Sequence, residues 1–319
     1  MTRSLPSFRI CARLGLATLL ATALSAQKLS VPVDGDRSLQ LYDLSALRPD
    51  GEPGDGSGPG ERECAQAAEL VRQFVAPTLR DGDDVRGLGG RWIAVLADAE
   101  RTAAVARLFD AARRHRNDLL HVEVRLFTVA AAAFQQHLRD QLVEDASKPR
   151  GERLVPAADA AAFLASVQAT GAAELSAPRL TVRPLQLATF VVGDTVAYVQ
   201  DFQVTHDGGR TLADPIVDTV FSGTRSEVCA TFLPGDHIGL NCSLLLQEVE
   251  RPIPEVETHL AGSTVPLKIQ LPKSRSVRLT TVAEVDPGAL ITIAAPQRDG
   301  NYLLAVVTAT VDTPAAGGR

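Results

Sequence analysis

The stretch that decides the fold is Ser226–Val249, SEVCATFLPGDHIGLNCSLLLQEV. Two runs of mainly apolar residues flank Pro234-Gly235-Asp236-His237, a pattern typical of a β-hairpin. With Gly235-Asp236 as a two-residue loop, the first position suits a type II′ turn. This stretch therefore predicts two long antiparallel strands, closed by Pro234 and His237.

The predicted register of this hairpin places Cys229 directly opposite Cys242. Counting outward from the turn makes them a non-hydrogen-bonded pair, in which side chains approach most closely. The two residues are therefore either a cross-strand disulfide or two reduced residues of the core. Cys64 would be left unpaired, either buried or available to another chain.

Other predicted strands surround this hairpin at short intervals. Runs with strand character and flanking turn residues continue from Glu174 almost to the end of the chain, which indicates an antiparallel, β-rich domain. An alternating strand, Leu119–Thr128, and two predicted helices, Ala130–Leu142 and Asp159–Thr170, precede them. The predicted strands are Leu175–Val182, Leu187–Val199, Ile216–Leu233, Ile238–Val249, Val265–Leu271, Val277–Val285, Leu290–Ala294 and Tyr302–Val311.

Residues 36–116 have a different pattern, that of a small α/β domain. Strand character at Ser38–Leu44 and Arg91–Leu96 alternates with amphipathic helices at Glu63–Val75 and Ala99–Arg114, and Asp98 is placed to cap the second helix. A Gly-rich and Pro-rich loop, Arg48–Arg62, interrupts the order. The sequence therefore predicts an α+β protein, with this domain followed by a β-rich domain containing two helices.

The first 26 residues have the pattern of a secretory signal peptide. Three arginines precede the apolar run Leu14–Leu24, and small residues near Ala26 offer a cleavage site. Cleavage after Ala26 would leave 293 residues and change the formal charge from −6 to −9. The alternative is an N-terminal anchor helix. We expect an exported protein of the periplasm or outer membrane, ending in a disordered tail at residues 313–319.

Composition excludes several classes of protein. The chain has 319 residues, with 38 Asp and Glu against 32 Lys and Arg, and this acidic balance argues against nucleic acid as a partner. The six histidines show no HExxH spacing, and no Cys-x-x-Cys or G-x-S-x-G motif occurs. We therefore predict no catalytic residues, no metal ligands and no cofactor.

The β-rich half resembles the secretin homology domain, the ring-forming module of type II and type III secretion and type IV pilus outer-membrane pores. The resemblance covers residues 118–312, and the segment that begins LQLYDLSAL resembles the small N-domains that precede this module. Its motifs occur in the family's order. They are HVEVRLFTV, AELSAPRLTVRPLQLATFVVGDTVAYV, SEVCATFLPGDHIGLNCSLLLQEV, VRLTTVAEVDPGALITIAA and YLLAVVTATV.

The resemblance implies roles for a few positions. The Ala177-Pro178 pair precedes a strand in the family, and Ala188 and Gly193 lie in the next strand and its turn. Pro234-Gly235 forms the turn of the long hairpin. It also implies self-association, or assembly with secretion-complex proteins, and outer-membrane association.

Three departures bear on the channel. The Pro-rich stretch RPIPEVETHLAGSTVP occupies the place where pore-forming members carry gate and membrane-lip segments, and only one N-domain is evident. The 1 Trp, 3 Tyr and 10 Phe are scattered, whereas a membrane barrel needs aromatic girdles. Two hypotheses follow: a non-enzymatic secretin-like structural protein that assembles through its β domain, or a soluble periplasmic binding or adaptor domain with the same fold.

Overall fold

The computed structural model describes residues 29–47, 60–75, 78–142, 151–207, 210–259, 266–297 and 299–312. The predicted signal peptide, residues 1–26, and the predicted tail, residues 313–319, lie outside these ranges. Most of the predicted loop Arg48–Arg62 lies outside them as well.

The first unit is a four-stranded antiparallel sheet with two helices. The strands are β1 (Leu29–Asp34), β2 (Arg37–Asp43), β3 (Asp84–Leu88) and β4 (Trp92–Asp98), in the order β1-β2-β4-β3. The helices α1 (Glu61–Phe74) and α2 (Ala99–Arg114) pack against this sheet. A 3-10 turn, η1 (Leu44–Leu47), follows β2. The Asp98 side chain accepts a hydrogen bond from the Arg101 backbone N–H at 2.9 Å, so the predicted helix cap is confirmed.

The second unit contains two large sheets, which we name by their surroundings. The helix-covered sheet has the order β6-β15-β16-β5-β7, with β8 also paired to β5, and the arm sheet has the order β14-β11-β10-β9. The strands of the first are β5 (Leu119–Val129), β6 (Gly151–Val155), β7 (Ala173–Ser176), β8 (Arg179–Val182), β15 (Leu290–Pro296) and β16 (Tyr302–Asp312). Those of the second are β9 (Gln186–Asp207), β10 (Arg210–Phe232), β11 (Ile238–Val249) and β14 (Ser274–Val285).

The predicted helices of this unit form as expected. A continuous helical segment runs through α3 (Ala131–Ala133), a π-helical turn at Phe134–Leu138 and α4 (Arg139–Leu142), and the other helix is α5 (Ala160–Ala169), after a 3-10 turn at Ala157–Asp159. The chain is thus α+β and rich in strands, which confirms the predicted fold class.

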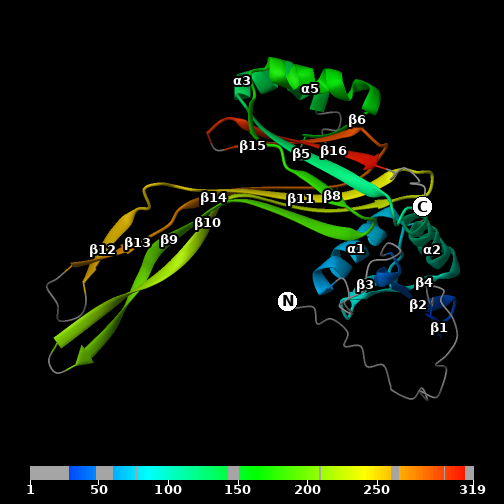
Figure 1. Cartoon of the computed structure of the whole chain (residues 1–319), viewed down its shortest axis with the longest axis horizontal. Helices are drawn as coiled ribbons and strands as arrows, with labels where there is room; N and C mark the ends of the chain where they lie inside the picture. The colour runs from blue at the N-terminus through cyan, green and yellow to red at the C-terminus, as the bar shows by residue number, and fades with distance from the viewer. Residues whose placement is uncertain are drawn as a thin grey trace, which may run out of the picture.

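The elements stack in four layers, which Figure 1 shows from top to bottom as helices, helix-covered sheet, arm sheet and first unit. Three apolar clusters join them. One fills the space between the two large sheets and another lies under α3–α5. The third joins the first unit to the arm sheet, because Leu185, Cys229 and Leu233 pack with the apolar residues of α1 and α2. The first unit therefore shares a core with the second.

A long arm projects from the arm sheet (Figure 1). Pairing between β10 and β11 ends at Gly223 and Gln247, whereas pairing between β10 and β9 continues to Arg210 and Asp207. A second hairpin, β12 (Glu255–His259) with β13 (Pro266–Gln270), lies beside it, and the Val199 N–H donates to Gln270 Oε1 at 2.9 Å. We define the arm as residues 194–207 and 210–222 together with β12 and β13. The sequence predicted that the strand at β9 ends at Val199 and that the strand at β10 begins at Ile216, so both predicted strands were shorter than β9 and β10.

The hairpin register differs by one residue from the prediction. Cys229 lies opposite Asn241, and Cys242 lies opposite Val228. The Leu233 N–H donates to the His237 carbonyl at 2.8 Å, so the loop has three residues, Pro234 to Asp236. A hydrogen-bonded closing pair exchanges two N–H donors, and Pro234 has none, which excludes the predicted closure.

The predicted disulfide between Cys229 and Cys242 is therefore wrong. With the register shifted by one residue, the two side chains lie on opposite faces of the arm sheet. Cys229 faces the first unit, and Cys242 lies in the core between the two large sheets. Both are free thiols, as is Cys64.

Candidate assembly surface

The arm sheet ends in two long edge strands. No strand in the described part of the chain pairs with the outer edge of β9, which has 22 residues, or of β14, which has 12. Such an edge presents a row of unpaired backbone donors and acceptors, to which another strand can add. Between Gln186 and Val199, β9 contains no Pro, Lys or Arg, the residues that commonly protect edges.

The edges of the other sheets are short or interrupted. The helix-covered sheet is bounded on one side by β6, which has five residues, and on the other by β7 and β8, which have four each. In the first unit, β3 has five residues, and β1 contains Pro32 and a register irregularity. Edges of this kind resist addition of another strand. The arm sheet is therefore the sheet best suited to strand addition.

The two long edges differ in charge. Strand β9 carries Asp194, Asp201 and Asp207 and no Lys or Arg, whereas β14 carries Arg275 and Arg278 with one acidic residue, Glu284. Opposite charges on neighbouring strands stabilise pairing, and like charges disfavour it. The acidic edge of β9 is therefore expected to pair with the basic edge of β14 in preference to another copy of β9.

The strand directions also fit. Each neighbouring pair in the order β14-β11-β10-β9 is antiparallel, so β9 and β14 run in opposite directions. When two copies stand side by side in the same orientation, β9 of one copy meets β14 of the next as an antiparallel pair. Because this contact is head-to-tail, it can repeat and close into a ring.

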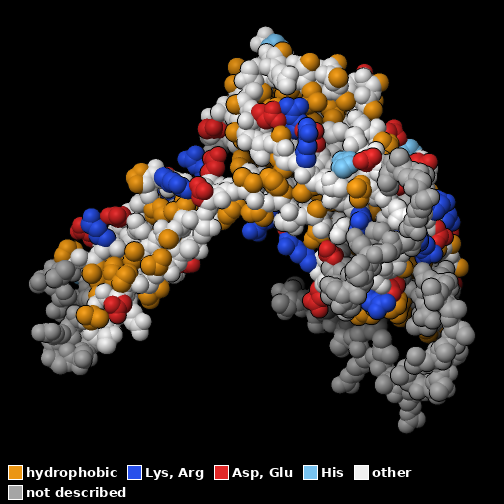
Figure 2. All heavy atoms as spheres, in the orientation of Figure 1, with side chains coloured by type: hydrophobic (Ala, Val, Ile, Leu, Met, Phe, Trp, Pro, Cys, Tyr) orange, Lys and Arg blue, Asp and Glu red, His pale blue; other side chains and the backbone are white. Residues whose placement is uncertain are grey.

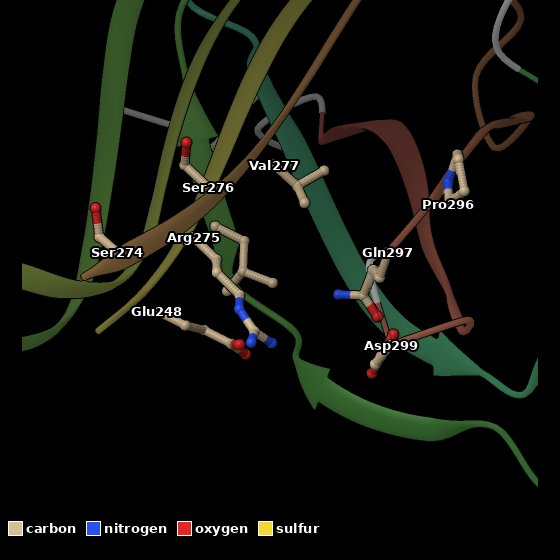
Figure 3. A pocket seen from close by; sticks show the side chains of 9 residues that line it. Glu248, Ser274, Arg275, Ser276, Val277, Pro296, Gln297 and Asp299 are labelled. Carbon is tan, nitrogen blue, oxygen red and sulfur yellow. The ribbon is translucent and has the colours of Figure 1, made fainter. Parts of the chain in front are cut away.

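A cleft of about 410 Å³ opens beside β14 (Figure 3). One wall comes from β11 and β14 and includes Leu246, Arg275 and Val277. The opposite wall comes from the end of β15, at Pro296, and from Gln297 and Asp299 in the turn that follows. Glu248, Ser274 and Ser276 complete the lining. The cleft thus joins an apolar floor to both positive and negative side chains at a free sheet edge.

In the arm, the hairpin of β9 and β10 has one face without charge. Cross-strand partners lie on the same face, and one face carries Asp194, Asp201, Asp214 and Asp218. Figure 2 shows hydrophobic side chains along the arm, with charged side chains beside them. The face of the hairpin opposite these four aspartates consists of five uncharged pairs. The pairs are Thr195/Phe221, Ala197/Thr219, Val199/Val217, Phe202/Pro215 and Val204/Ala213. The hairpin is therefore amphipathic.

The positions singled out from the family resemblance lie apart in the structure. Ala177 and Pro178 separate β7 from β8, and the Pro178 carbonyl accepts a hydrogen bond from Val124 N–H at 3.0 Å. Ala188 and Gly193 both lie inside β9, so the expected turn at Gly193 is wrong. Pro234 and Gly235 form the hairpin tip, where Gly235 has φ +94°. Of these residues, Ala188 and Gly193 belong to the free edge.

Burial leaves the cysteines poor nucleophiles. It raises the pKa of the Cys64 thiol to about 11, with smaller contributions from Glu63 and Asp43, and that of Cys229 to about 12. Burial also raises the pKa of Cys242 to about 12, although the nearby Ser226 hydroxyl opposes this. Since the thiolate is the reactive form, these residues have a structural role.

The described residues contain neither a metal-binding cluster nor a membrane-spanning helix. No group of three or more His, Cys, Asp or Glu side chains there is arranged to hold a metal ion. None of the helices in those ranges is both long and apolar enough to cross a membrane.

Several elements of the structure were not predicted from the sequence. They are β1, β6, β12 and the extension of β9 and β10 into the arm. The extension has a signal, because Phe202, Val204, Ala213 and Pro215 continue the apolar alternation. The cleft has none, because it joins the β14 edge to the distant Pro296–Asp299 turn.

Comparison with known proteins gives only weak similarity. No family model and no curated protein matches the chain. Among solved structures, the chain is similar to the type IV competence pilus secretin PilQ of V. cholerae, with 12% identity, a TM-score of 0.30 and coverage of 87% of this chain and 78% of that one. The secretin domain of InvG from the Salmonella SPI-1 injectisome is 11% identical, with a TM-score of 0.28 and coverage of 79% of this chain and 81% of that one. Aeromonas hydrophila ExeD is 9% identical, with a TM-score of 0.23 and coverage of 88% of this chain and 60% of that one.

Identities and TM-scores at this level do not assign the chain to a family.

Proposed function

We propose that this chain is an exported, non-enzymatic, secretin-like structural protein that assembles with copies of itself through the arm sheet. The observation that carries the proposal is the pair of long free edges, β9 and β14, which have opposite charge and opposite direction. Pairing them would extend the sheet from copy to copy and satisfy the edge backbone groups. The first unit would then repeat around the assembly, because it shares a core with each arm sheet.

The uncharged face of the arm supports association with the outer membrane. Val217 on that face is 58% exposed, and its neighbours Thr195, Ala197, Pro215 and Thr219 are exposed as well. Exposed apolar surface of this kind marks a site of contact with a membrane or another protein. Partners from a secretion or pilus complex would contact the assembled form.

The test is the state of association of the purified full chain. Native mass spectrometry and negative-stain imaging should show one discrete multimer with a closed outline. The variant Arg275→Glu/Arg278→Glu makes both edges acidic and should shift the protein toward monomer. The matched control Arg107→Glu/Arg114→Glu makes the same charge change on the exposed side of α2, and it should keep the multimer.

A strictly monomeric wild-type protein at high concentration would overturn the proposal. That result would favour the alternative, a soluble periplasmic binding or adaptor domain. Membrane fractionation gives a second readout, since the proposal expects a heat-resistant multimer in the outer-membrane fraction.

A further inference from the structure

The cleft beside β14 has its complement at the far edge of the same sheet. Val192, Thr224, Leu246 and Val277 form one continuous cross-strand row, because each residue is the register partner of the next. Leu246 and Val277 line the cleft, and Val192 stands at the opposite, β9 end of the row. All four side chains lie on the face directed toward the helix-covered sheet.

The exposed residues of β9 on this face match the cleft in chemistry. Val192 is 54% exposed, and the side chain of Asp194, two residues further along the same face, is 78% exposed. On the cleft side, apolar Leu246, Val277 and Pro296 lie next to Arg275. The β9 edge thus presents an apolar residue next to an acidic one, and the cleft presents an apolar floor next to a basic residue.

Resting on the proposed function, we infer that the cleft of one copy receives Val192 and Asp194 of the next copy. Val192 then contacts Val277, and Asp194 contacts Arg275, so that the row Val192-Thr224-Leu246-Val277 continues without offset into the neighbour. Glu248, the register partner of Arg275, lies on the other side of that guanidinium. The arginine is therefore placed between two carboxylates.

Other registers lose this match. Because side chains alternate along a strand, the pairing can move only in steps of two residues without reversing the faces. One step in one direction places Asp194 against Val277, and one step in the other places Val192 against Arg275. Each buries a charge against an apolar side chain, which is costly.

Asp194 forms an ion pair within its own chain. Its carboxylate lies 3.5 Å from Arg251, and both side chains are more than half exposed. An exposed pair of this kind contributes little to stability. Asp194 is therefore free to form a second ion pair across the copies.

Cysteine cross-linking of the full chain reads this register directly. The variant Val192→Cys/Val277→Cys should form a disulfide-linked ladder of copies under mild oxidation. The link cannot form within one chain, because the two residues are three strand spacings, or about 14 Å, apart. In Val191→Cys/Val277→Cys the first cysteine points to the other face, and this control should stay uncross-linked. Cys64, Cys229 and Cys242 are buried and should not interfere.

Charge reversal gives a second readout. Asp194→Arg alone should weaken the multimer at least tenfold, and Asp194→Arg/Arg275→Asp should restore it. The control is Asp201→Arg, at a position in the arm beyond the cleft. Adding Arg275→Asp to this variant should not strengthen its multimer.

The outcomes separate the inference from the proposed function. A multimer that cross-links through another β9 position, such as Val196→Cys with Val277→Cys, would overturn this register and keep the assembly. A multimer without cross-links between β9 and β14 would overturn it as well. Absence of any multimer in the wild-type protein would overturn both.

Discussion

The imidazole of His115 stacks on the ring of Phe232, with the ring centroids 4.1 Å apart. His115 is the C-cap residue of α2, and Phe232 is the last residue of β10, so this contact joins the first unit to the arm sheet. His115 Nδ1 also lies 2.6 Å from Asp118 Oδ2, and Nε2 lies 3.5 Å from Asp236 Oδ1. One side chain thus holds the connection between the units and the hairpin tip together.

His115→Ala should therefore destabilise the protein. Loss of the aromatic contact costs about 1 kcal/mol, and the carboxylate contacts disappear with it. Thermal unfolding should show a lower midpoint, and limited proteolysis should show faster cleavage near residues 116–118. His259→Ala, at an exposed position on β12, is the control and should leave both unchanged. Equal stability of the two variants would contradict this role of His115.

The cysteines should be unreactive in the folded protein. Cys64, Cys229 and Cys242 are buried, and burial raises their pKa values to about 11 to 12, so almost no thiolate exists at neutral pH. Alkylation at pH 8 should label none of the three until denaturant is added, and then should label all three. Non-reducing peptide mapping that finds Cys229 joined to Cys242 would contradict the observed register.

The pattern of the chain predicts elements better than it predicts their pairing. Apolar alternation and helical spacing identified α1, α2, α5 and the hairpin of β10 and β11, because each depends on residues close in sequence. The register of that hairpin depends on the loop length, because Pro234 has no N–H to donate and cannot close a two-residue loop. A loop longer by one residue places Cys229 and Cys242 on opposite faces of the sheet and not opposite each other.

The candidate assembly surface was harder to predict. The family resemblance indicated self-association, but which edges are free depends on the order β14-β11-β10-β9, which no local pattern contains. The short strand β6 and the break between β7 and β8 at Pro178 shorten the edges of the helix-covered sheet, and their position at an edge is known only once the strand order is known. The cleft joins residues near 246, 275 and 297, which meet only after both large sheets have formed.

Gly193 should not tolerate a side chain. A Cβ atom at this position would lie 2.6 Å from Gly223 Cα on the paired strand β10, and also against the Ser222 carbonyl. Both are backbone atoms, so the two strands would have to separate where the arm begins. Gly193→Ala should therefore lower the free energy of unfolding by roughly 1–3 kcal/mol.

The control for Gly193 is Thr195→Ala, two residues further along the same face, where the side chain is exposed. Chemical denaturation of both variants provides the measurement. A loss of stability that is equal in both would indicate that strand propensity, and not the close approach of β9 to β10, limits this position.

Acid should destabilise the first unit through Asp43. Burial would raise the pKa of this carboxyl, but hydrogen bonds from Arg91 and Ser45 outweigh it and hold the pKa below its usual range. The Arg91 guanidinium lies 2.6 Å from Asp43 Oδ2 and connects the end of β2 to the start of β4. Because the folded pKa is lowered, the stabilisation is complete above the ordinary Asp pKa of about 3.9 and is lost as pH falls through the lower folded value.

Asp43→Asn should therefore be less stable than the wild type at pH 7, and the difference should shrink as pH falls below about 4. Thermal unfolding from pH 7 to pH 2.5 measures both effects. Asp36→Asn removes an exposed carboxyl in the turn between β1 and β2 and should follow the wild-type curve. A constant difference between Asp43→Asn and the wild type over this range would show that the ion pair with Arg91 does not stabilise the fold.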